Sequence, residues 1–184
     1  MEKYNTNKAG SLFLLAGLIE FFIFLNIAAF VDKGYSISNN TISHLGIDGT
    51  PYIFNISIII LGIFEIISGL LLYKYSKIFT LLLLIGGIGA AGVGIFNEHF
   101  GMLHLAFAIL AFLSPSILSY FAMSRFRNML GYEWAFMGSI AIIALVLFAS
   151  GNYFGLGDGG MERLILIPNL IWAFQFSAAL YNKK

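Results

Sequence analysis

The residues best suited to chemistry are three histidines and one neighbouring glutamate. The chain has three histidines, His44, His99 and His104, and Glu98 directly precedes the second. Imidazole nitrogens and carboxylate oxygens ligate zinc, and an open coordination position would activate a water molecule. Two ligands on one helix face must stand three or four residues apart. His99 and His104 have a different spacing, so only a folded loop would bring them together at a zinc-type site.

Further polar side chains lie near these histidines or in the corresponding loops. The candidate polar cluster contains Asn40, Ser43, His44, Asn55, Asn97, Glu98, His99, His104, Asp158, Glu162 and Arg163. Arg163 stands near the start of a predicted helix, where the helix dipole disfavours a cation. We therefore expect an anion beside it, either a carboxylate of this cluster or a lipid phosphate. Three interpretations stay open: a metal site, a pocket for a polar head group, and a structural cluster that joins loops.

The composition shows what kind of element must position these residues. The 184 residues are 59% hydrophobic and 10% charged, whereas a soluble domain is about half apolar and about a quarter charged. The chain is therefore predicted to be an integral membrane protein. A net charge of +1 gives no basic field for nucleic acid, and the absence of cysteine excludes disulfides and thiolate sites.

Six apolar segments are long enough to cross a membrane. A bilayer core about 30 Å thick needs about 20 apolar residues in a helix. The predicted spans are 10–30, 52–73, 78–96, 103–123, 134–154 and 161–181. These segments predict one all-α domain over residues 1–184, a polytopic bundle of six transmembrane helices.

The basic residues predict the orientation of this bundle. With six spans, both termini share one side with eight of the ten basic residues: Lys3, Lys8, Lys74, Lys77, Arg125, Arg127, Lys183 and Lys184. Lys33 and Arg163 lie toward the other side. Basic residues concentrate in cytoplasmic loops, so we expect a multi-pass protein of the cell membrane with cytoplasmic termini. The candidate polar cluster would then lie at the outer face.

Features within the spans and the first outer loop add further expectations. Small residues at four-residue spacing in 86–94 predict that the third helix packs closely at the centre of the bundle. Glu20 and Glu65 are intramembrane carboxylates, which are costly to expose to lipid. They fit either hydrogen-bonded packing or a proton or solute path. The loop 35–46 predicts a short interfacial helix, with Gly46 in the left-handed conformation that ends a turn.

At these residues the chain resembles the six-helix membrane proteins of domain-of-unknown-function family 998, which is common in archaea and bacteria. The resemblance covers essentially the whole chain, and it rests on the segments 40–46 and 92–98 and on Asn55, His104, Gly159, Glu162, Arg163 and Trp172. Many relatives have proline in place of Asn97 and an acidic residue in place of His44, which weakens a metal site based on His44. The resemblance implies the fold and the membrane location, and no established reaction.

The sequence leaves three functions open. The first is a structural or binding role for the outer polar cluster, including that of an accessory subunit in a larger membrane complex. The second is a metal-assisted hydrolase that acts on lipid head groups at the outer leaflet, with zinc as its cofactor. The third is a proton or small-solute carrier that uses Glu20 and Glu65. The expected partners are membrane lipid and other membrane subunits, and nucleic acid is not expected.

Overall fold

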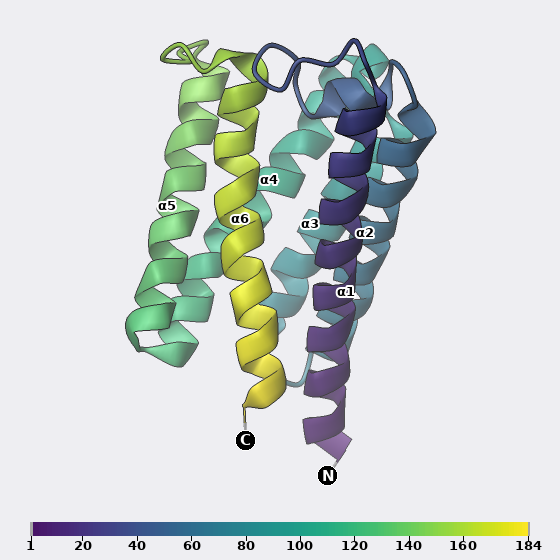
Figure 1. Ribbon diagram of the computed structural model, residues 1–184. Helices are drawn as coiled ribbons and strands as arrows, with labels where there is room; N and C mark the ends of the chain where they lie inside the picture. The colour runs from purple at the N-terminus through teal and green to yellow at the C-terminus, as the bar shows by residue number, and fades with distance from the viewer. Residues whose placement is uncertain (1, 184) are drawn as a thin grey trace.

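The computed structural model describes residues 2–183 and is built from helices (Figure 1). Its long helices are α1 Glu2–Val31, α2 Pro51–Leu71, α3 Lys77–Ile95, α4 Met102–Phe126, α5 Met129–Ala149 and α6 Gly157–Asn182. Two short 3₁₀ helices, η1 Ser43–Gly46 and η2 Glu98–Phe100, lie in the loops. Within the described chain, these six long helices each have the length and apolar composition of a membrane span. The predicted all-α, multi-pass architecture is confirmed.

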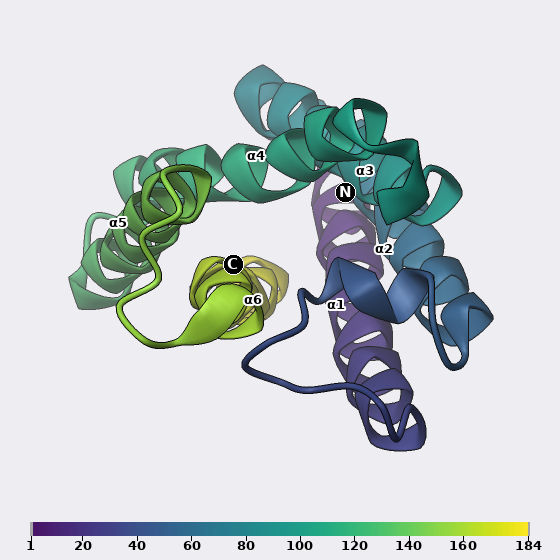
Figure 2. The ribbon, with the colours of Figure 1, turned by 90° about the horizontal axis from the view of Figure 1, so that it is seen from above.

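The six helices form a closed ring in chain order. Each helix packs against the next, and α6 returns to contact α1 (Figure 2). Helix α6 also contacts α4 across the ring. The two chain ends lie at the same end of the bundle (Figure 1). We call the opposite end, which carries η1, η2 and the loop before α6, the far end.

Close packing of α3 explains its many small residues. A Cβ atom added to Gly87 would lie 2.6 Å from the carbonyl oxygen of Gly62 in α2. One added to Gly89 would lie 2.9 Å from the carbonyl carbon of Leu110 in α4. Helices that approach this closely gain packing contacts in lipid, where hydrophobic burial gives little driving force. Burial reaches 61% in the α3 span, more than in the other five spans, as expected for a central helix.

Helix α5 begins and ends five residues earlier than the sequence predicted. The side chain of Asn128 accepts a hydrogen bond from the backbone N–H of Gly131 at 3.0 Å, which caps the helix at its start. An asparagine at this position satisfies an amide that has no partner within the helix. At the other end, Gly151 has a φ of 71°, a conformation that breaks the helix. The predicted start at Trp134 missed this cap.

Candidate functional site

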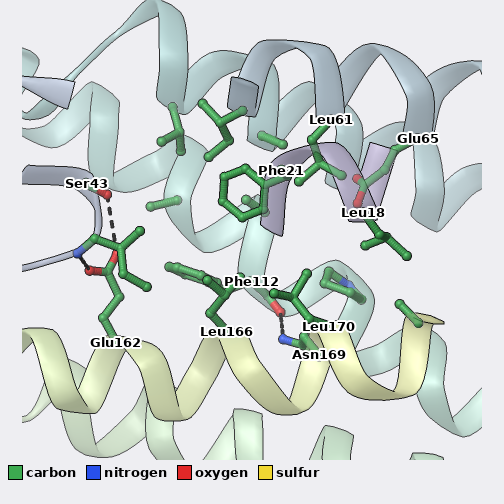
Figure 3. A pocket seen from close by; sticks show the side chains of 18 of the residues that line it. Leu18, Phe21, Ser43, Leu61, Glu65, Phe112, Glu162, Leu166, Asn169 and Leu170 are labelled. Carbon is green, nitrogen blue, oxygen red and sulfur yellow. Dashed lines mark hydrogen bonds between the residues drawn. The ribbon is translucent and has the colours of Figure 1, made fainter. Parts of the chain in front are cut away.

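Glu162 ties α6 to the first loop of the far end. Its side chain is buried, with 4% of the residue surface exposed. One carboxylate oxygen accepts a hydrogen bond from the backbone N–H of Ile42, and the other accepts one from the hydroxyl of Ser43 at 3.3 Å (Figure 3). The predicted span 161–181 would put Glu162 in the first turn of its helix, whereas the start of α6 at Gly157 places it in the second turn. The carboxylate therefore serves as an acceptor for the loop.

Glu98 performs a similar role beside His44. One oxygen of Glu98 accepts a hydrogen bond from the hydroxyl of Thr41, and the other lies 3.4 Å from Nδ1 of His44. Nε2 of His44 lies 3.1 Å from a carboxylate oxygen of Asp48. Both ring nitrogens of His44 therefore face carboxylate oxygens, one from Glu98 and one from Asp48. This chain of contacts joins η1 to η2.

The amides of Asn55 and Asn97 meet at one backbone carbonyl. Both side-chain nitrogens donate to the carbonyl oxygen of Gly46, at 2.9 Å from Asn55 and 3.4 Å from Asn97. The prediction that Gly46 is left-handed is wrong, because the positive φ of 61° in this loop belongs to Gly49. A side chain at Gly46 would collide with the amide oxygen of Asn55. Glycine therefore suits position 46 because the side chain of Asn55 lies too close to the backbone for a Cβ atom.

Arg163 is held by neutral groups of the first loop and of the first turn of α6. Its guanidinium donates to the carbonyl oxygens of Ile37 at 2.9 Å and Gly159 at 3.1 Å, and to the phenol oxygen of Tyr35 at 2.8 Å. The expected anion beside Arg163 is not among these contacts within the described chain. Three oxygen acceptors and the Tyr35 ring, 5.5 Å from the guanidinium carbon, satisfy the charge instead.

Tyr35 is the partner of Arg163 with the clearest mutational test. Its phenol also donates to the carbonyl oxygen of Thr41 at 3.0 Å. We expect Tyr35→Phe to lower the free energy of unfolding by about 1–3 kcal/mol, because donors and acceptors of the half-buried loop lose their partner. The midpoint of thermal unfolding in detergent measures this loss. Tyr52→Phe, at an exposed tyrosine of α2, is the matched control, and an equal loss there would contradict the assignment.

The same phenol makes the loop sensitive to high pH. Burial raises the pKa of Tyr35 above its usual value of 10, and this effect exceeds the opposing influence of Arg163. A raised pKa in the folded state means that the neutral phenol stabilises the fold below about pH 10. This contribution is lost as the pH rises through the folded pKa.

Two other members of the predicted cluster lie apart from these carboxylates. His99 is exposed, and its backbone N–H donates to the side chain of Asn97 at 3.2 Å. Asp158 lies in the first turn of α6, where the helix dipole favours an anion. Asn40 shapes the first loop by accepting a hydrogen bond from the backbone N–H of Ser36 at 2.8 Å. The structure thus brings together only part of the predicted cluster.

A cavity of about 570 Å³ lies next to Glu98 and Glu162. Its wall comes from the first loop, η2, α4, α5 and α6. Its polar part consists of Thr41, Ser43, Glu98, His104 and Glu162, and the remaining residues are apolar. Nδ1 of His104 lies 2.7 Å from the carbonyl oxygen of Phe96. Because a carbonyl only accepts, this hydrogen bond requires a proton on Nδ1 and leaves Nε2 as an acceptor in the neutral ring.

A second, narrow cavity of about 60 Å³ lies inside the ring. Glu162 and Glu65 stand at its opposite ends, with apolar side chains such as Phe21 and Leu166 between them (Figure 3). Glu20 instead lines a separate groove with Ser57 between α1 and α2. Glu65 and Glu20 thus line different cavities, one inside the ring and one between α1 and α2, and a proton or solute path that uses both stays a prediction of the sequence.

A family model covers most of the chain, including the segments of the far end. The family model described as "Protein of unknown function (DUF998)" matches residues 14–179. The chain belongs to the DUF998 family. No match is found among curated proteins or among solved structures. The DUF998 match includes η1, η2, the start of α6 and all the polar residues of the 570 Å³ cavity.

No cluster suited to a metal is found in the described part of this DUF998 chain. Among residues 2–183, no group of three or more histidine, aspartate or glutamate side chains has the arrangement for a metal ion. His44 has both nitrogens next to carboxylates, His104 has Nδ1 committed to a carbonyl, and His99 is exposed. Zinc binding by His44, His99, His104 and Glu98 stays a prediction of the sequence.

Sequence reasoning missed Tyr35 and Thr41 as members of the site. Thr41 had a detectable signal, because threonine caps helical turns, and its hydroxyl accepts the backbone N–H of His44 at 3.1 Å. Tyr35 had none, because its partner Arg163 is 128 residues away. Both residues act by fixing the loop that presents Ile42 and Ser43 to Glu162.

Proposed function

We propose that this DUF998 protein binds a membrane lipid in the 570 Å³ cavity, with the head group at the polar end and an acyl chain along the apolar wall. One observation carries the proposal: the cavity joins polar groups of the far end to exposed apolar side chains on the outside of the bundle. Leu105, Ile109 and Val146 line it and are 44%, 41% and 62% exposed. The cavity is therefore accessible from the side of the bundle.

The dimensions and chemistry of the cavity suit this occupant. Ligand pockets have volumes of about 300–1,000 Å³ and combine apolar walls with a few polar groups. Here the apolar wall comes from α4, α5 and α6, and the polar groups gather at the far end. An acyl chain would cover the apolar side chains, while a head group would reach Glu98 and Glu162. A bilayer lipid matches this division of the cavity.

The distribution of charge supports an outward orientation for the far end. Eight of the ten basic residues belong to the termini and to the loops on the same side as the termini. Short loops rich in lysine and arginine stay in the cytoplasm. We therefore place the cavity at the outer leaflet, in a protein whose termini are cytoplasmic. A tag at either terminus that reacts with a membrane-impermeant reagent in intact cells would contradict this placement.

Filling the cavity should release the lipid. We expect Val146→Trp to reduce the amount of lipid retained by the purified protein at least tenfold, because the indole would occupy the space of the acyl chain. Native mass spectrometry after mild detergent extraction measures the retained lipid. Ile143→Trp is the matched control, since Ile143 is on the same helix with a similar exposed fraction of 60% and does not line the cavity. Equal lipid retention by both variants would overturn the proposal.

A further inference from the structure

We infer that the head group of the bound lipid carries a primary ammonium, as in an aminophospholipid. This inference rests on the proposed function and adds the chemical class of the ligand. It follows from the hydrogen-bonding groups that the polar end of the cavity offers and from those that it lacks.

Every side-chain donor that lines the cavity is already committed to a protein acceptor. The hydroxyl of Thr41 donates to Glu98, and that of Ser43 donates to Glu162. Nδ1 of His104 donates to the carbonyl oxygen of Phe96. Glu98 and Glu162 are carboxylates without a donor, and the other side chains in the wall are apolar. A ligand in the cavity therefore meets no free side-chain donor.

Acceptors, in contrast, remain available at the same place. Each carboxylate oxygen has two lone pairs, and the contacts with Thr41, Ser43, His44 and Ile42 give the four oxygens of Glu98 and Glu162 one partner each. Nε2 of His104 adds an acceptor when the ring is neutral. The polar end can thus receive several hydrogen bonds from one head group.

The charges at this end favour a cation. Two carboxylates line the cavity, and neither lysine nor arginine does. Arg163, the nearest arginine in the chain, uses its guanidinium on Ile37, Gly159 and Tyr35 outside the cavity wall. A primary ammonium brings a positive charge and three N–H donors, and hydrogen bonds between ionised groups are the stronger ones. A quaternary ammonium has the charge without donors, and an anionic head group with hydroxyls has donors without the positive charge.

The test compares lipids that differ only in the head group. The full-length protein is placed in nanodiscs that contain equal amounts of phosphatidylethanolamine, phosphatidylcholine and phosphatidylglycerol with identical acyl chains. Native mass spectrometry then measures which lipid remains bound after the disc is released. We expect phosphatidylethanolamine to be retained about tenfold more than either competitor. Equal retention of the three lipids, or preference for one of the competitors, would overturn the inference.

Glu98→Gln tests whether the cavity carboxylates cause this preference. This variant keeps the shape of the side chain and removes one negative charge, so we expect the preference for phosphatidylethanolamine to fall at least threefold. Asp158→Asn is the matched control, because it removes one carboxylate at the same end of the bundle outside the cavity wall. If both variants change the preference equally, general surface charge explains it and the inference fails. A thermal unfolding midpoint for each variant confirms that it is folded.

Failure of the inference and failure of the proposed function give different results. If Val146→Trp abolishes lipid retention but the head groups compete equally, the cavity binds lipid without the ammonium preference. If retention of all three lipids is unaffected by Val146→Trp, the lipid is bound elsewhere, and both proposals are wrong. A phosphatidylethanolamine preference that Val146→Trp and Glu98→Gln both remove supports both.

Discussion

Replacing Gly87 with valine is expected to lower the free energy of unfolding by about 3 kcal/mol, the upper part of the usual range for overpacking. The backbones of α2 and α3 meet at this glycine, where an added Cβ would lie 2.6 Å from the carbonyl oxygen of Gly62 and 2.8 Å from the side chain of Ile66. A backbone oxygen cannot rotate away as a flexible side chain does, so the two helices must separate. Thermal unfolding of the protein in a mild detergent measures the effect.

The control for Gly87→Val separates overpacking from the insertion of a β-branched residue into a helix. Ala178→Val adds a similar side chain at an exposed position of α6, and the unfolding midpoint of this variant should stay close to that of the unchanged protein. If Gly87→Val shows the same midpoint as Ala178→Val, the close approach of α2 and α3 at Gly87 is incorrect.

Removing the carboxylate of Glu162 should have an effect of similar size at the far end. Glu162→Ala leaves the backbone N–H of Ile42 and the hydroxyl of Ser43 without their acceptor in a buried place. Each unsatisfied buried group costs about 1–3 kcal/mol, so we expect a loss of about 3 kcal/mol or more. Faster hydrogen exchange at the Ile42 amide, together with a lower unfolding midpoint, would show that the loop has detached from α6.

Two further variants define the role of Glu162. Glu162→Gln keeps one acceptor oxygen, so it should retain the bond to Ile42 and lose less stability than Glu162→Ala. Asp158→Ala removes a carboxylate one turn earlier on α6 and should leave exchange at Ile42 unchanged. Faster exchange at the Ile42 amide in Asp158→Ala, or unchanged exchange there in Glu162→Ala, would contradict the hydrogen bond between Glu162 and Ile42.

The number and class of the helices could be predicted because they depend on properties that are local in sequence. Each span is an apolar run of membrane length, and the small residues of 86–94 indicate a closely packed helix by their spacing alone. The start of α5 was also encoded locally, in the capping residue Asn128, but the predicted span began at Trp134 and left Asn128 in the preceding loop. Loops that alternate between the two sides then place the polar residues of three loops at one end.

The arrangement within the site could not be predicted, since it depends on how each helix is rotated about its axis. Residue counts place Glu20 and Glu65 at a depth in the membrane but do not say which surface they face, and the structure puts them in separate cavities. The acceptors of Arg163 include the backbone carbonyl of Ile37, which any residue type at that position would supply. The sequence suggested a carboxylate partner because it identifies side chains, whereas every residue has a backbone carbonyl and the sequence does not show which one is close.

The link between Glu162 and Ile42 has a consequence for how the protein is made. These residues are 120 positions apart, and α6, which carries Glu162, is the helix that closes the ring against α1. During synthesis the first loop leaves the ribosome well before α6, so the Ile42 amide and the Ser43 hydroxyl cannot meet the Glu162 carboxylate until α6 is inserted. A nascent chain that stops before α6 therefore lacks both the acceptor for the Ile42 amide and the helix that closes the ring against α1.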